Sequence, residues 1–186
     1  GLLLVGPEGA EARAVEIWNR DGSAGGACLN GLRVAALWLG GEEGVFQMAG
    51  HRVNWKRRAG RVELFLPEEG LPTRESMDEI HVGGLDGLGI PFWNPHAVFS
   101  VDDPDAVDLG TLAAETRRLG HLFPEGVNVE IVGPATGGRV SARVDERGVG
   151  ETESCGSGAV AICLAMGAAG VSGPPAAAGG CTRTAS

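Results

Sequence analysis

Two Gly-rich turns decide how this chain folds: DGSAGGACLNG at residues 21–31 and ETESCGSG at residues 151–158. Each turn carries a cysteine, Cys28 or Cys155, that is followed three residues later by glycine. Each turn then runs into a short apolar segment with helical periodicity. Because both halves of the chain repeat the order of strands, Gly-rich turn and apolar helix, we expect two related lobes.

Short strands dominate the rest of the chain. Alternation of apolar and polar residues predicts strands whose side chains point to opposite faces in turn. The predicted strands are residues 14–18, 61–66, 97–101, 127–132 and 139–145. The predicted helices are residues 31–39, residues 112–119, which stop at Gly120, and residues 158–169, which are apolar on nearly every side and so should be buried.

These elements predict an α+β fold of two pseudo-symmetric lobes. Each lobe should be a curved, mainly antiparallel sheet around a buried helix, with the site in the cleft between the lobes. We expect an N-terminal lobe of residues 1–80 and a C-terminal lobe of residues 81–186, with the change of lobe somewhere in 67–90. The Ala- and Gly-rich end from about residue 173 lacks apolar periodicity, which predicts a disordered or non-native tail.

The composition limits the partners that are expected. Hydrophobic residues make up 43% and charged residues 21%, which is typical of a soluble globular protein. The net charge of -9 argues against nucleic acid. No segment has the length of a transmembrane helix, and no signal peptide is expected, so we predict a cytoplasmic protein with reduced thiols. The four cysteines form no C-x-x-C pair, which argues against a metal site.

A cysteine at a helix start suits acid–base chemistry. The unpaired N–H groups of the first turn favour the thiolate and lower the thiol pKa, and the same groups bind anions such as a carboxylate. Two such turns could hold one carboxylate with a thiol on each side of the neighbouring carbon. One thiolate would take the α-proton and the other thiol would return a proton to the opposite face. That sequence inverts the stereocentre without a cofactor.

Simpler interpretations exist for each cysteine. A buried structural thiol is the preferred one for Cys163, inside an apolar helix, and for Cys181, in the tail. The matched turns favour chemistry for Cys28 and Cys155, and a redox disulfide between these two is an open alternative. Other amino-acid racemases use pyridoxal phosphate on a lysine. The only lysine, Lys56, lies in a basic run, so we expect no cofactor.

Four blocks of sequence, in the right order, resemble the signature of the diaminopimelate epimerase family. They are Asn19-Arg-Asp-Gly-Ser23 with Cys28-Leu-Asn-Gly31, Asn94-Pro-His96, Phe123-Pro-Glu-Gly-Val-Asn128-Val, and the segment from Glu146-Arg-Gly to Cys155-Gly-Ser-Gly158. Four ordered blocks are far more specific than a single motif. The resemblance implies an isomerase that interconverts LL-2,6-diaminopimelate and meso-diaminopimelate, in lysine and peptidoglycan precursor biosynthesis, without pyridoxal phosphate.

The resemblance also implies a role for each matched residue. Cys28 and Cys155 would form the acid/base pair, and His96 and Glu146 would tune their pKa values. The implied substrate-binding residues are Asn19, Leu29, Asn30, Asn94, Asn128, Glu146, Arg147, Gly156 and Ser157. Paired Asn amides and an Arg fork suit the distal amine and carboxylate of the substrate. A small-molecule substrate and a homodimer are the partners to expect.

The chain departs from the family pattern at two positions. Leu29 stands where the family has Gly, so its side chain is expected either to crowd the carboxylate or to force a different backbone angle on the turn. Trp93 stands where a small residue precedes Asn-Pro-His in the family. Relative to the family, the chain also starts late and the strands after the last helix are missing or replaced. Two other functions stay open. One is a proline- or hydroxyproline-type racemase, which Asn19, Asn128 and Arg147 disfavour, and the other is a truncated relative that binds without catalysis.

Overall fold

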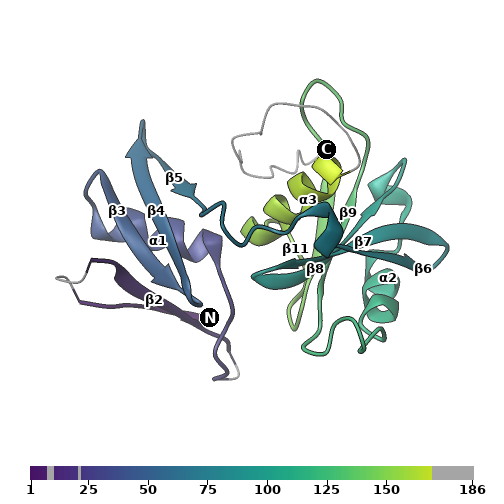
Figure 1. The fold of residues 1–186 in the computed structure, drawn as a ribbon, viewed down its shortest axis with the longest axis horizontal. Helices are drawn as coiled ribbons and strands as arrows, with labels where there is room; N and C mark the ends of the chain where they lie inside the picture. Colours follow the sequence, from purple (N-terminus) through teal and green to yellow (C-terminus); the bar gives the residue numbers. More distant parts are fainter. Residues whose placement is uncertain (8–10, 21, 169–186) are drawn as a thin grey trace. The chain divides into compact units, whose positions relative to one another are not determined.

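The computed structural model describes residues 1–7, 11–20 and 22–168, and the chain divides into two compact units (Figure 1). The first unit is Gly1–Leu71 and the second is Pro72–Ser186. The boundary between them lies before residue 80, a position that falls inside a strand of the second unit. The tail from about residue 173, with Cys181, lies outside the described residues. Among the described helices, none is both long enough and apolar enough to span a membrane.

The first unit is a five-stranded mixed sheet in the order β1-β2-β3-β4-β5, with one helix. Its elements are β1 (Leu2–Val5), β2 (Arg13–Trp18), α1 (Leu29–Leu39), β3 (Glu43–Met48), β4 (His51–Arg58) and β5 (Arg61–Phe65). Strands β2 and β3 run parallel, so the chain must cross over between them, and α1 makes this crossover. The helix contacts β1, β2 and β5, and it buries Leu29, Leu32, Ala35 and Ala36.

Tight hairpins close the second half of this sheet. The β3–β4 and β4–β5 connections are two residues long, and Met48 pairs with His51 in the first of them. Each turn consists of an alanine followed by a glycine, and both residues have positive φ. The alanines, Ala49 and Ala59, each have a φ of 48°. This is the type I′ geometry, whose twist matches that of the flanking strands.

The second unit is a six-stranded mixed sheet in the order β11-β10-β9-β8-β7-β6, with two α-helices. Its strands are β6 (Asp78–Val82), β7 (Leu85–Phe92), β8 (Asn94–Ser100), β9 (Asn128–Val132), β10 (Ala142–Glu146) and β11 (Gly150–Thr152). Its helices are η1 (Arg74–Ser76), η2 (Pro104–Ala106), α2 (Leu109–Thr116) and α3 (Gly156–Ala168). Among the described strands of this unit, only β8 and β9 pair in parallel, and α2 lies in the crossover between them. Each unit is therefore mainly antiparallel, as predicted.

The two α-helices of the second unit cover opposite faces of its sheet (Figure 1). Alternate residues of a strand point to opposite faces. In β9, Val129 and Ile131 join the apolar core that α2 completes. Glu130 points the other way, toward the start of α3. As a result β9 is buried along its whole length, and a carboxylate lies in the interior.

The predicted α+β class is confirmed, and several predicted boundaries are corrected. The strand predicted at 139–145 begins only at Ala142, because Arg139 closes a turn by pairing with Thr136. The helix predicted at 112–119 is Leu109–Thr116. It begins earlier because the carboxylate of Asp108 accepts the N–H of Thr111 as an N-cap, and it ends earlier because the following turns use i to i+3 hydrogen bonds.

The expectation of burial on every side of the last helix was wrong. Helix α3 buries Ser157, Gly158, Ala161, Ile162 and Ala165, but Cys163 is exposed. One face of α3 packs on β7, β8 and β9, so apolar residues on the opposite side lie at the surface. Cys163 is therefore an exposed thiol and not the buried structural one that was predicted.

Candidate active site

Cys28 caps helix α1 in the first unit. Its extended backbone ends the preceding loop, and its Sγ accepts the N–H of Gly31 at 3.2 Å. Its own N–H donates to the thioether sulfur of Met48 at 3.2 Å. A Cβ on Gly31 would lie 3.2 Å from the Cys28 sulfur and 3.1 Å from Leu3, so glycine leaves room for the thiol. The predicted placement of Cys28 at a helix start is confirmed.

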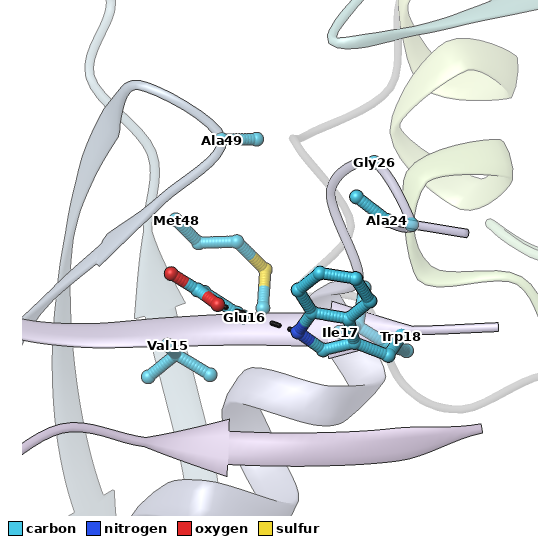
Figure 2. A pocket seen from close by; sticks show the side chains of 9 residues that line it. Val15, Glu16, Ile17, Trp18, Ala24, Gly26, Met48 and Ala49 are labelled. Carbon is cyan, nitrogen blue, oxygen red and sulfur yellow. Dashed lines mark hydrogen bonds between the residues drawn. The ribbon is translucent and has the colours of Figure 1, made fainter. Parts of the chain in front are cut away.

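The loop that precedes Cys28 lines a cavity of about 250 Å³ (Figure 2). Its walls are Val15, Glu16, Ile17, Trp18, Ala24, Gly25, Gly26, Met48 and Ala49. The indole N–H of Trp18 donates to the carboxylate of Glu16 at 3.3 Å, as Figure 2 shows. None of the predicted site residues lines this cavity, although Met48 connects it to the backbone of Cys28.

The other predicted residues of the first unit lie around this loop. The Asn19 amide donates to the Ser23 hydroxyl at 3.1 Å and so shapes the turn. The Asn30 side-chain oxygen accepts from the guanidinium of Arg33 at 3.2 Å. Leu29 is only 3% exposed, so its side chain is buried at the start of α1. Since that side chain packs in the core, a ligand could use only the backbone of Leu29.

Cys155 occupies the matching position at the start of α3 in the second unit. Its Sγ accepts the N–H of Gly158 at 3.4 Å and lies 3.4 Å from the hydroxyl of Ser157. Its carbonyl accepts the N–H of Ala159 at 3.0 Å, which begins the helix. A Cβ on Gly158 would lie 2.6 Å from the Glu130 carboxylate, so only glycine fits here. The same Cys-x-x-Gly pattern thus produces the same thiol cap in both units.

The environment of Cys155 corrects one expectation from the sequence. Burial raises the pKa of the Cys155 thiol to about 12, although the hydrogen bonds from Ser157 and Gly158 lower it. The negative charges of Glu146 and Glu130 raise the pKa further. The helix start acts in the predicted direction, but desolvation outweighs it. Cys155 is therefore a protonated thiol at neutral pH.

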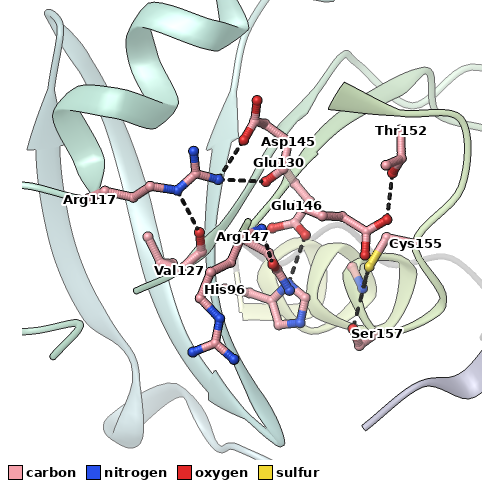
Figure 3. A network of polar contacts seen from close by, with 12 residues as sticks. His96, Arg117, Val127, Glu130, Asp145, Glu146, Arg147, Thr152, Cys155 and Ser157 are labelled. Carbon is pink, nitrogen blue, oxygen red and sulfur yellow. Dashed lines mark hydrogen bonds and ion pairs between the residues drawn. The ribbon is translucent and has the colours of Figure 1, made fainter. Parts of the chain in front are cut away.

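A buried histidine–carboxylate pair lies beneath this turn (Figure 3). His96 Nδ1 and Glu130 Oε1 are 2.7 Å apart, and both side chains are completely buried. Burial raises the pKa of Glu130 above its usual value, against the opposing effect of His96. Sequence reasoning singled out His96 but missed Glu130. The available signal was a carboxylate among the apolar residues of the predicted strand 127–132.

Glu146 is the last residue of strand β10 and Arg147 follows it, at the edge of the same network (Figure 3). The Thr152 hydroxyl donates to Glu146 Oε1 at 2.5 Å. The Asn128 side-chain oxygen accepts the backbone N–H of Arg147 at 2.8 Å, and the Arg147 guanidinium donates to the carbonyl of Glu125. The predicted binding residues Asn128 and Arg147 therefore contact each other directly.

A second arginine stabilises the strands that carry these residues. The Arg117 guanidinium donates to the carbonyl of Val127 at 3.3 Å and to the carbonyl of Asp145 at 3.2 Å (Figure 3). It also forms an ion pair with the Asp145 carboxylate. Arg117 thus ties β9 to β10 directly beside Asn128 and Glu146. No sequence motif pointed to this residue.

The structure therefore gathers the predicted residues into one group in each unit. Cys28, Leu29 and Asn30 share the start of α1, with Asn19 in the preceding loop. In the second unit, Cys155, Gly156 and Ser157 begin α3, whereas Asn94, His96, Asn128, Glu146 and Arg147 come from β8, β9 and the end of β10. Fold and site together define an α+β protein with a thiol-capped helix in each of two units.

Comparison with known proteins identifies the family. The diaminopimelate epimerase family model matches residues 93–173. The chain is 35% identical to the diaminopimelate epimerase of Zymomonas mobilis, over 88% of this chain and 64% of the relative. It is 34% identical to that of Erythrobacter litoralis, over 92% and 67%, and 38% identical to that of Mycolicibacterium smegmatis, over 79% and 55%. The chain belongs to the diaminopimelate epimerase family.

Two consequences follow from these matches. The relatives are named diaminopimelate epimerases, which does not favour the alternative of a proline-type racemase. The chain spans about two thirds or less of the length of these three relatives.

Proposed function

We propose that this chain carries out cofactor-independent epimerisation of LL-2,6-diaminopimelate to the meso form, with Cys28 and Cys155 as its acid and base. The observation that carries the proposal is the pair of matched thiol caps. Each sulfur accepts the N–H of the glycine three residues later, at 3.2 Å in one unit and 3.4 Å in the other. Epimerisation by two bases needs one poised thiol for each face of the α-carbon.

The state of Cys155 suggests how the cycle begins. Because burial raises the pKa of Cys155 to about 12, this residue starts as the acid. Cys28 then acts as the base and takes the α-proton as a thiolate. The electron pair left on the α-carbon accepts the Cys155 proton from the opposite face. One proton enters and one leaves, so the stereocentre inverts, Cys28 ends as the thiol and Cys155 as the thiolate. The reverse reaction exchanges these roles.

The remaining residues bind the substrate in this proposal. The N–H groups at the two helix starts, with Asn30, Gly156 and Ser157, hold the reacting α-carboxylate. Glu146 attracts the α-ammonium, and this positive charge would offset the effect of Glu146 on Cys155. Asn19, Asn94, Asn128 and Arg147 bind the distal amine and carboxylate. Leu29 contributes backbone only.

The cellular setting follows from the reaction. Meso-diaminopimelate is a precursor of lysine and peptidoglycan, so the protein would act in the cytoplasm on a free amino acid. The proposal requires a lobe for each cysteine, which the predicted lobes at 1–80 and 81–186 would supply. A homodimer remains a prediction.

Exchange of the α-proton in deuterated water tests the proposal. Incubation with LL-diaminopimelate should place deuterium on the α-carbon and form the meso isomer, as followed by mass spectrometry and chiral chromatography. Cys28→Ala and Cys155→Ala should each reduce turnover by at least about a thousandfold, because each removes a reacting group. Cys163→Ala, which removes an exposed thiol, should retain full activity.

Three results would contradict the proposal. Binding of diaminopimelate without exchange would indicate a relative that only binds. Exchange of proline in preference to diaminopimelate would indicate the racemase alternative. Retention of turnover by either active-site cysteine variant would exclude the two-thiol mechanism.

A further inference from the structure

We propose that Glu130 is a positioning residue that holds His96 with its Nδ1 proton directed at the Glu130 carboxylate. In this arrangement His96 Nε2 carries no proton, and the pair places one buried negative charge beneath the Cys155 turn. Its catalytic consequence rests on the proposed epimerisation, whereas its protonation state does not.

Strand register brings the two side chains together. His96 of β8 pairs with Asn128 of β9 in a parallel ladder, and Glu130 lies two residues further along β9. Residues two apart in a strand share a face, so Glu130 is the diagonal neighbour of His96. Both side chains are 0% exposed, and their facing atoms are 2.7 Å apart. The backbone of the sheet therefore fixes the contact.

The two outer atoms of the pair define its protonation. Within the described residues, His96 Nε2 and Glu130 Oε2 are buried and have no hydrogen-bond partner. Two bare acceptor atoms 2.7 Å apart would repel each other, so one proton lies between Nδ1 and Oε1. In the proposed arrangement this proton belongs to Nδ1, which leaves Nε2 bare and the Glu130 carboxylate ionised.

The pair lies directly under the catalytic turn. A Cβ placed on Gly158 would be 2.6 Å from Glu130 Oε1 and 3.3 Å from Cys155 Cβ. The missing side chain of Gly158 therefore makes the space in which the carboxylate approaches the turn. Phe92, completely buried with its ring 6.5 Å from the His96 ring, keeps the other side apolar. In such surroundings a change of one charge acts strongly on its neighbours.

Charge links the pair to the thiol. Besides burial, two negative charges oppose ionisation of Cys155, those of Glu146 in β10 and Glu130 in β9. His96 of β8 is hydrogen-bonded to Glu130. With one shared proton the pair carries a negative charge and disfavours the thiolate. A neutral residue in place of Glu130 would remove that opposition.

Two substitutions separate the charge from the contact. Glu130→Gln removes the charge but keeps a hydrogen-bonding partner for Nδ1, whereas Glu130→Met removes both in a side chain of similar length. Glu125→Gln is the matched control, because it changes the same charge at an exposed position of the same unit. Thermal unfolding and circular dichroism of each variant establish that it folds. Should Glu130→Met fail to fold, Glu130→Gln and the wild-type protein still decide the question.

Nitrogen NMR of the imidazole tests the protonation state directly. In wild-type protein labelled with ¹⁵N-histidine, neutral His96 should show a protonated Nδ1 and a bare Nε2. Glu130→Met should shift His96 toward the Nε2–H form that free imidazole side chains favour. A wild-type His96 that is neutral with its proton on Nε2 would overturn the proposal.

Alkylation of the intact protein by iodoacetamide tests the link to Cys155. The rate at Cys155, resolved by peptide mass spectrometry, should reach half its maximum about one pH unit lower in Glu130→Gln. Cys28 in the same sample should be unchanged, as should Cys155 in Glu125→Gln. An unmoved Cys155 profile in folded Glu130→Gln would overturn the proposal.

The exchange assay separates this inference from the proposed function. Glu130→Gln should reduce kcat by about a hundredfold, with little change in KM, because it alters proton transfer and not substrate contacts. If the wild-type protein shows no exchange at all, the proposed function fails. The NMR and alkylation results then still decide whether Glu130 positions His96.

Discussion

The two cysteine turns share one backbone plan but differ in what surrounds the sulfur. In both, the thiol caps a helix and accepts the N–H of the glycine three residues later. At Gly31 the space left by the missing Cβ faces the end of the flexible Leu3 side chain. At Gly158 the same space faces the buried Glu130 carboxylate. A local motif therefore sets the cap, whereas neighbouring strands set the electrostatics.

The difference shows why one motif can serve two roles. Cys28 has a thioether beside its backbone, because Met48 of β3 lies next to the turn. Cys155 has two carboxylates near it, because β9 and β10 carry Glu130 and Glu146. An acid and a base are distinguished when their environments separate their pKa values. Substitutions that change these surroundings, and leave the motif intact, test the comparison.

The largest effect on stability is expected from Gly158→Ala. The new Cβ would meet the buried Glu130 carboxylate at 2.6 Å, so the variant should lose about 2 kcal/mol of unfolding free energy. Gly31→Ala should stay within about 1 kcal/mol of wild type, because Leu3 can move. Gly167→Ala, where a Cβ meets nothing within 4 Å in the same helix, should gain about 0.5–1 kcal/mol. Urea unfolding measures all three, and equal losses at Gly31 and Gly158 would contradict the comparison.

Glu146→Gln tests the difference in ionisation between Cys155 and Cys28. The Glu146 charge raises the pKa of Cys155, so removing it should lower that pKa and increase the thiolate fraction at any given pH. The pH at which iodoacetamide modifies Cys155 at half its maximal rate should fall by about one unit. Cys28, in the other unit, should keep its profile. A parallel shift of both cysteines would show that the charge acts through the whole protein.

Trp93 of the second unit lies in a strained backbone conformation. The tryptophans described in the first unit have no such strain, so Trp93 tests a difference between the units. Its φ of 22° favours glycine, but its ring stacks on Phe92 with centroids 5.0 Å apart. Relief of the backbone, at about 1–2 kcal/mol, should offset the lost stacking of about 0.5–1.5 kcal/mol. Trp93→Gly should therefore leave stability within about 1 kcal/mol of wild type. Trp93→Ala, which loses the stacking and keeps the strain, should be the less stable variant by chemical denaturation.

The smallest effect is expected in a hairpin. The first unit uses Ala-Gly in its type I′ turns, whereas the β6–β7 turn of the second unit uses Gly83-Gly84. Asparagine adopts positive φ more readily than alanine, so Ala59→Asn should stabilise the first unit by about 0.5 kcal/mol. Gly84→Ala, with φ of 78°, should destabilise the second unit. A thermal shift of opposite sign in either variant would contradict this interpretation.

Particular residues show how far sequence reasoning reached. The two thiol-capped helices followed from Cys-x-x-Gly ahead of an apolar segment, because capping is a local interaction. The strand predicted at 127–132 is present as β9. The start of α2 was misplaced because the N-cap is Asp108, four residues ahead of the apolar stripe that was used to locate the helix. Cys163 was misjudged because an all-apolar helix does not reveal which side the sheet covers.

By itself, the sequence determined the α+β class, the two matched turns and the family, since these depend on local periodicity and on residue order. Tertiary structure alone decided the charge around Cys155. Glu130 approaches the Cys155 turn from β9, a strand that ends more than twenty residues before Cys155. The parallel pairing of β8 and β9 places Glu130 there, and the missing Cβ of Gly158 leaves room for its carboxylate. Electrostatic effects depend on distance and burial in space. That is why a motif that favours a thiolate instead holds Cys155 as a thiol with a pKa of about 12.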